Sequence, residues 1–210
     1  MKDRVLFEVS WEVGNMVGGI YTVLATKAQT MQALYGDDYI TVGPDLPRDG
    51  GPPNFREEPW LPEVLEELSG VSIGIRMGRW LIPGEPKCLL INFADLFAQK
   101  DEILTRYWEK YGLDSLLGEW DYLEPVMFAH GAGVAIELLV RHFYLEEEKQ
   151  VVVHAHEWLS GAAVLHMREA MAEVATVFTT HATQLGRALS SRHPGTELNT
   201  ILANTPGEQL

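Results

Sequence analysis

Apolar residues recur at two different spacings along the first part of the chain, and the two spacings predict different elements. Residues 5–9 predict a short strand, whereas residues 20–34 carry apolar side chains at helical spacing. Gly36 is a good C-terminal cap for that helix, and residues 39–42 predict the next strand. A strand, a helix and a strand in this order form a βαβ unit, which implies a parallel sheet.

The rest of the chain predicts further strands and helices. Continuous valines at residues 151–153 indicate a strand that is buried on both faces. The apolar stretch at 126–144 is interrupted by ionisable side chains and predicts a buried helix rather than a membrane span. The elements expected are a surface loop at 44–62, a short helix at 62–68, a hairpin-like pair of strands at 71–75 and 79–82, strands at 88–93, 151–156 and 175–180, and helices at 103–111, 124–145 and 159–171. The predicted fold class is therefore α/β, with a Rossmann-like parallel sheet.

The composition bears on the partners of the chain. Its 210 residues carry a formal net charge of −14, and an acidic chain repels nucleic acids and anionic lipid surfaces. A neutral polymer such as a glucan is indifferent to that charge, and a local basic pocket can still bind a phosphate.

The single cysteine, Cys88, allows no internal disulfide. Charges interrupt the N-terminus too soon for a signal peptide, so we expect a cytoplasmic protein. The acidic surface is compatible with a homo-oligomer.

Polar side chains follow four of the predicted strands, at the point where each strand ends. In open α/β sheets, ligands bind beyond the carboxyl ends of the strands, so these groups are expected to line one crevice. They are Ser10-Trp11-Glu12, Asn92, His156-Glu157-Trp158 and Thr180-His181.

Gly18 and Gly19 open the first predicted helix, where backbone N–H groups and the helix dipole favour an anion such as a phosphate. The loop matches neither the dinucleotide fingerprint nor a P-loop, so a tight turn explains the two glycines equally well. Arg187 stands at the start of another predicted helix, where it could reach a phosphate or simply be exposed.

Three histidines raise the question of a metal site. His154 and His156 share one face of their predicted strand, and with His181 they could hold a metal ion. The alternative, which we favour, has His154 as a hydrogen-bonded interior residue and the other two lining the crevice singly. Glu157 is either a surface residue or a ligand of a sugar hydroxyl. Trp158 either stacks on a sugar or packs in the core.

Seven segments, in order and at compatible spacing, resemble glycogen synthases of the animal and fungal type. They are residues 5–13, 17–24, 78–82, 108–115, 121–126, 154–158 and 178–187. The resemblance implies a GT-B fold, in which two Rossmann-like domains face each other across a cleft. Residues 1–190 would form its N-terminal, acceptor-side domain and residues 191–210 a tail, while the C-terminal nucleotide-binding domain would be absent.

The same resemblance implies an activity. The family transfers glucose from a nucleotide sugar, UDP-glucose or ADP-glucose, to the 4-hydroxyl of an α-1,4-glucan with retention of configuration and without a metal or cofactor. Gly18, Gly19, His156 and Arg187 would hold the donor. His181 and Glu157 would contact the transferred glucose near the reacting carbon, where an oxocarbenium-like transition state forms.

The chain departs from the family pattern at one of these positions. The family usually carries lysine two places before the paired glycines, whereas this chain has Met16. Methionine supplies no charge to the donor phosphates, so another cation must substitute or donor binding is weak. Two alternatives to an enzyme domain therefore stay open: a half-domain that binds glucan or a partner without catalysis, and a metal-dependent hydrolase built on the three histidines. We expect the chain alone to be inactive.

Overall fold

A computed structural model of the chain describes residues 4–49, 51–52, 54–61, 71–144, 149–183, 186–188, 191, 195–197, 199–200 and 203. The chain divides into two compact units, Met1–Thr179 and Thr180–Leu210, and each is described by itself. The short helix predicted at residues 62–68 lies outside the described residues.

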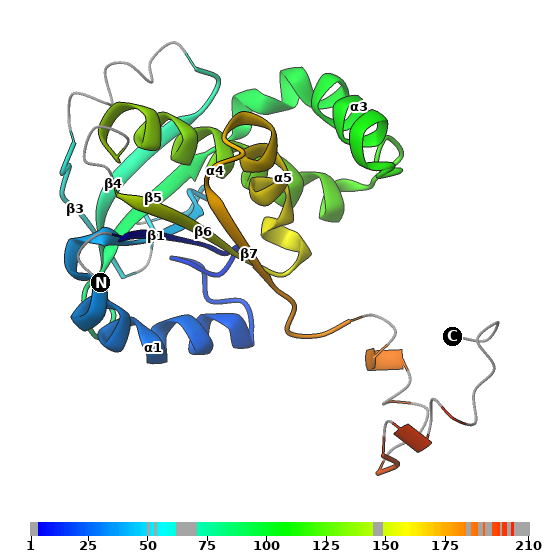
Figure 1. Ribbon diagram of the computed structural model, residues 1–210, viewed down its shortest axis with the longest axis horizontal. Coiled ribbons are helices and arrows are strands. Elements are labelled where there is room, and N and C mark those ends of the chain that lie inside the picture. The colour runs from blue at the N-terminus through cyan, green and yellow to red at the C-terminus, as the bar shows by residue number, and fades with distance from the viewer. Residues whose placement is uncertain are drawn as a thin grey trace. The chain divides into compact units, whose positions relative to one another are not determined.

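A sheet of seven strands forms the centre of the first unit (Figure 1). The strands are β1 (Arg4–Val9), β2 (Tyr39–Pro44), β3 (Phe55–Glu57), β4 (Gly74–Trp80), β5 (Lys87–Asn92), β6 (Gln150–His156) and β7 (Ala175–Thr179). Their order across the sheet is β3-β4-β5-β2-β1-β6-β7. The five strands from β5 to β7 are parallel, which confirms the predicted Rossmann-like parallel sheet. β1 lies between β2 and β6, so the first strand of the chain is central.

The predicted hairpin-like pair at residues 71–75 and 79–82 is wrong. The structure has instead a single strand, β4, which pairs antiparallel with β5 on one side and with β3 on the other. Position 78 in this strand has no room for a side chain, because the paired strand β3 lies too close. A Cβ on Gly78 would meet the Arg56 carbonyl oxygen at 2.2 Å. β3 itself lies within the segment at 44–62, which was predicted to be only a loop.

Helices cover both faces of the sheet (Figure 1). They are α1 (Gly19–Tyr35), α3 (Lys100–Tyr111), α4 (Trp120–Leu139) and α5 (Gly161–Ala170), with short 3₁₀ turns η1 (Gly36–Asp38), η3 (Ala94–Gln99) and η5 (Trp158–Ser160) and a π-helical turn η4 (Val140–Tyr144). Val5 and Phe7 belong to the core that α4 and α5 complete, whereas Leu6 packs with Leu24 of α1. The alternation of side chains along β1 thus feeds two separate hydrophobic layers.

Helix α4 is the most apolar of the α-helices that the structure describes. By length and composition the segment Trp120–Tyr144 could cross a membrane, but 72% of its 18-residue apolar window is buried within the protein. Met127 and Phe128 on successive positions are both fully buried, so the helix is enclosed on several sides. It is a core helix that packs on the sheet beside α5, and it confirms the buried helix that the sequence predicts.

Candidate functional site

The turn that follows β6 carries the most unusual backbone of the candidate site. Glu157 has φ 63° and ψ 168°, a combination that residues other than glycine rarely adopt. Its N–H donates to the Thr179 carbonyl at 2.8 Å, and its carbonyl accepts the Ser160 N–H at 3.1 Å. The Ser160 hydroxyl also donates to the His156 carbonyl. These bonds hold the strained residue at the carboxyl ends of two neighbouring parallel strands, which is where α/β proteins bind ligands.

A buried carboxylate lies behind this turn. The Glu8 side chain is 0% exposed and accepts hydrogen bonds from Lys27 and Tyr39. His156 Nε2 lies 2.6 Å from Glu8 Oε1. Burial alone would raise the pKa of Glu8, but the bonds from His156, Lys27 and Tyr39 outweigh it and lower the pKa to about 2. Glu8 therefore stays ionised and joins β1, β2, β6 and α1.

The same carboxylate bears on the question of whether the histidines hold a metal ion. Glu8, His154 and His156 bring one potential ligand atom each within 4.8 Å of one another. However, the Lys27 ammonium already binds the Glu8 oxygen that faces both histidines, and His154 Nε2 lies 2.8 Å from Thr179 Oγ1. This arrangement is a hydrogen-bonded network with its own internal cation, which favours the interpretation without a metal.

Of the two histidines on β6, the structure buries His156, whose ring is 2% exposed instead of lining a crevice. Its role in donor binding stays a prediction, and its observed contact is with Glu8. His154 is partly buried and bonded to β7, in agreement with a hydrogen-bonded interior residue.

The N-terminus of α1 holds a carboxylate of the chain itself. Glu12 Oε2 accepts hydrogen bonds from the N–H groups of Gly18 and Tyr21, both at 2.8 Å. A Cβ on Gly18 would meet Glu12 Oε1 at 2.9 Å, whereas a Cβ on Gly19 would meet nothing within 4 Å. The tight fit at Gly18 therefore comes from Glu12. The donor-phosphate roles of Gly18 and Gly19 stay predictions.

An arginine that the sequence did not single out reaches the same loop. Arg48, in the loop after β2, donates a hydrogen bond to the side-chain oxygen of Asn15. Asn15 is 3% exposed, and its side-chain NH₂ donates to the Trp11 carbonyl at 3.2 Å. Its neighbour Met16, at the position where the resemblance leads us to expect a lysine, is 74% exposed.

The remaining site predictions, His181 and Arg187, fall in the second unit. There, Arg187 donates its N–H to the Thr183 carbonyl at 3.0 Å, and the Thr183 hydroxyl accepts the Gly186 N–H at 2.9 Å. Arg187 also lines a hollow of about 490 Å³ within this unit. The roles of both residues stay predictions.

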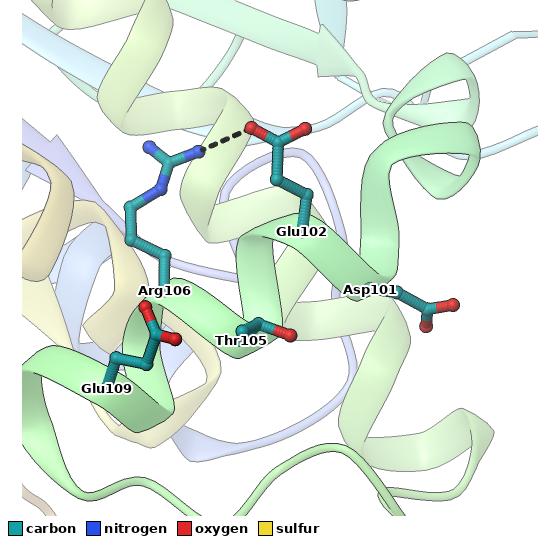
Figure 2. A pocket seen from close by; sticks show the side chains of 5 residues that line it. All are labelled: Asp101, Glu102, Thr105, Arg106 and Glu109. Carbon is teal, nitrogen blue, oxygen red and sulfur yellow. Dashed lines mark ion pairs between the residues drawn. The ribbon is translucent and has the colours of Figure 1, made fainter.

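One further hollow, on α3, carries no candidate site. Figure 2 shows that its five lining side chains all come from that helix and splay outward, with Asp101 directed away from the ion pair of Glu102 and Arg106. That ion pair is long, at 3.8 Å. Because the polar groups do not converge, this surface offers no binding geometry.

Comparison with known proteins assigns the chain to a family. The model of the glycogen synthase family matches residues 8–199. The chain belongs to the glycogen synthase family. Among its relatives, the glycogen [starch] synthase of Neurospora crassa is 36% identical over 192 residues, which are 90% of this chain and 27% of that protein. The Saccharomyces cerevisiae isoform 2 is 31% identical over 200 residues, 90% of this chain and 28% of that protein. The mouse liver enzyme is 32% identical over 192 residues, with coverages of 90% and 27%.

A solved structure is also similar to this glycogen synthase family member. The catalytic domain of starch synthase IV from Arabidopsis thaliana, bound to ADP and acarbose, has a TM-score of 0.45 and 16% identity, covering 94% of this chain and 38% of that one. The chain thus spans a little over a quarter of the length of the curated relatives named above, since it covers 27% to 28% of them.

Three residues of the site were not predicted to be functional. Glu8 could have been noticed in the sequence, because it is the only charged residue between Val5 and Val9 in a predicted strand that is otherwise apolar. Glu12 was noted only as part of a polar triplet, and Arg48 lay in a segment predicted to be a surface loop. Their partners are set by the fold, so their contacts became visible only with the structure.

Proposed function

We propose that this chain forms the N-terminal, acceptor-side domain of a retaining glucosyltransferase. The complete protein would transfer glucose from a nucleotide sugar to the 4-hydroxyl of an α-1,4-glucan. Family membership makes this chemistry the expected one, and the structural observation that carries the proposal is the backbone of Glu157. A strained residue at the carboxyl ends of parallel strands is typical of a functional site, because the surrounding hydrogen bonds fix the backbone from which its side chain projects.

Each candidate residue has a role in this proposal. Glu157 and His181 contact the glucose as it leaves the donor, and Gly18, Gly19, His156 and Arg187 belong to donor binding. Glu8 acts behind them: it fixes the His156 ring and thereby the start of the Glu157 turn. Such fixed polar groups stabilise a developing positive charge without having to reorganise.

Further features of the proposal concern the whole protein. Its donor is UDP-glucose or ADP-glucose, and it needs no metal or cofactor. Residues 1–190 form the N-terminal domain of a GT-B enzyme, residues 191–210 a tail, and a second domain binds the nucleotide. The protein works in the cytoplasm, and the acidic surface is compatible with a homo-oligomer.

The test is the incorporation of labelled glucose into glycogen by the complete protein, with UDP-glucose and ADP-glucose assayed in parallel. We expect transfer from one donor, unaffected by EDTA, and a product that α-amylase degrades. Glu157→Gln should lower kcat by about a hundredfold, the range observed when a transition-state contact is removed. Glu109→Gln, which changes an exposed carboxylate on α3, serves as the matched control and should leave transfer unchanged.

Two results would contradict the proposal. Transfer from neither donor would show that the complete protein is no glucosyltransferase. A Glu157→Gln variant as active as Glu109→Gln would show that the strained turn has no part in the reaction.

A second candidate function, glucan binding without catalysis, is favoured by one aromatic surface. Trp158 and Tyr122 stack with ring centroids 5.9 Å apart and planes at 9°, beside an apolar hollow of about 380 Å³ that Phe178 also lines. Half-exposed aromatic rings of this kind can stack on sugar faces. Retention of the isolated chain on immobilised amylose, lost in Trp158→Ala, would support this function if the complete protein transfers no glucose.

A further inference from the structure

The loop before α1 carries a fixed positive charge that neither the sequence nor the family pattern assigns. Arg48 is exposed, yet its guanidinium is held on the side-chain oxygen of Asn15. Asn15 is buried and is itself fixed by its bond to the Trp11 carbonyl. A buried amide that anchors an exposed arginine limits the positions that the guanidinium can take, which reduces the entropy lost when it binds a ligand.

The charge of Arg48 is not used within the described part of the protein. Among the described residues, no carboxylate forms an ion pair with its guanidinium, although acidic residues outnumber basic ones by 30 to 16. Other arginines of the sheet region are paired: Arg76 with Asp45 and Glu57, and Arg79 with Asp37. An arginine without a carboxylate partner in so acidic a chain remains available to an external anion.

An anion bound at the loop before α1 would need a nearby cation to offset the negative charge of Glu12. Glu12 brings a carboxylate to the N-terminus of α1 and uses the N–H groups of Gly18 and Tyr21. An anionic ligand that approaches this loop is repelled by Glu12, whose bonds already occupy the N–H groups of Gly18 and Tyr21. Gly18 therefore serves the donor by allowing a close approach to the backbone and not by its own N–H. Met16 contributes no charge, and the Lys27 ammonium is bound to Glu8. Arg48 is therefore the cation that the described structure attaches to this loop.

We propose that Arg48, positioned by Asn15, binds the phosphates of the nucleotide sugar in this protein and takes the role for which Met16 lacks a charge. The inference rests on the proposed function, since the nucleotide sugar is the anion that the site would meet. A guanidinium presents a planar fork of N–H donors that matches phosphate oxygens, so it can serve from a neighbouring loop where an ammonium would serve from position 16.

Steady-state kinetics of the complete native protein test the proposal. Arg48→Ala should raise the KM for the donor about tenfold or more, because a charge-assisted hydrogen bond is lost, with a smaller change in the KM for glycogen. Adding Met16→Lys to Arg48→Ala should restore most of the donor affinity. The matched control is Arg168→Ala, which removes another exposed arginine that has no ion pair among the described residues and lies on α5.

The outcomes separate this inference from the proposed function. If the native protein transfers glucose and its donor KM is equal to that of Arg48→Ala and Arg168→Ala, the role of Arg48 is overturned. The proposed glucosyltransferase function would then still hold. If the native protein transfers no glucose, calorimetry with inorganic pyrophosphate decides: affinity reduced about tenfold in Arg48→Ala alone supports the phosphate site, and equal affinity overturns it.

Discussion

Glu12 Oε2 accepts the N–H of Gly18 at 2.8 Å, so a side chain six positions earlier caps the first helix of the protein. The bond satisfies one of the backbone donors that an α-helix leaves free at its N-terminus, and the carboxylate lies at the positive end of the helix dipole. Gly18 itself has no side chain to serve as a cap. The capping function has thus moved from the N-cap residue into the preceding loop.

Removal of this cap should destabilise the protein measurably. We expect Glu12→Ala to lower the free energy of unfolding by about 1 kcal/mol, the usual effect of losing an N-terminal cap. Urea denaturation measures it. The control is Glu119→Ala, since Glu119 stands at the N-cap of α4 without a side-chain capping bond. Equal losses in the two variants would mean that the Glu12 contact does not stabilise α1.

The strain at Glu157 can be measured with a pair of variants that both lack the carboxylate. Glu157→Gly and Glu157→Ala differ by one methyl group, and only glycine adopts φ 63° and ψ 168° without strain. Strain of this kind costs about 1–3 kcal/mol, so the glycine variant should unfold at higher urea concentration than the alanine variant. Equal midpoints would show an unstrained turn. Loss of transfer in both variants is expected if Glu157 contacts the substrate.

Helices α4 and α5 meet at a glycine. A Cβ on Gly133 would lie 2.8 Å from the Cβ of His166, whose ring is fixed by Glu137 at 2.7 Å. Gly133→Ala should therefore push the helices apart and, despite the better helix propensity of alanine, lower the free energy of unfolding by about 1–2 kcal/mol. Gly161→Ala is the control, because its Cβ would make an ordinary contact of 3.5 Å. Thermal unfolding of both variants distinguishes the two sites.

Acid should destabilise the protein through His130. Burial, together with His166 and Arg106, lowers the pKa of His130 from 6.5 to about 3, while Tyr107 holds its Nδ1 at 2.7 Å. Between these values the unfolded state binds the proton and the folded state does not, so stability falls as pH decreases from 6.5 towards 3. At pH 5 this group should cost about 2 kcal/mol relative to neutral pH.

A variant isolates this contribution. His130→Gln keeps an acceptor for the Tyr107 hydroxyl but cannot take up a proton in the unfolded state. Its free energy of unfolding should therefore change less between pH 7.5 and pH 5 than that of the native protein. Parallel pH profiles for the two proteins would exclude His130 as the source of the acid sensitivity.

Local patterns in the sequence predicted most of the elements around the site. Helix α1 ends at Gly36, whose φ of 61° suits a residue without a side chain, and the valines of β6 reflect burial among parallel strands. β4 was not predicted as a single strand, because the predicted pair at 71–75 and 79–82 was interrupted at residues 76–78, which include Gly78. Gly74 and Gly78 are both explained by neighbouring strands: Asn92 of β5 lies 3.3 Å from a Cβ built on Gly74.

The rule that ligands bind at strand ends singled out Glu157 from the sequence, but it did not indicate the Glu8 carboxylate that lies behind the Glu157 turn. Glu8 and His156 are 148 positions apart, and no spacing in the sequence connects them. The contact between Arg48 and Asn15 likewise depends on how the loop after β2 folds back over the loop after β1. Pairwise contacts of this kind are decided by the register of the sheet, and a single sequence carries no local record of them.

The central position of β1 has a consequence for how the protein is made. β1 is synthesised before the other strands of this sheet, and its neighbour β6 follows only at Gln150–His156, so at 5–20 residues per second roughly seven to thirty seconds pass before the second neighbour exists. During that time one edge of an apolar strand stays open on the ribosome. The Glu8 charge, still in water, then discourages pairing with another nascent chain, as gatekeeper residues do. The residue that stabilises the finished sheet thus protects the unfinished one.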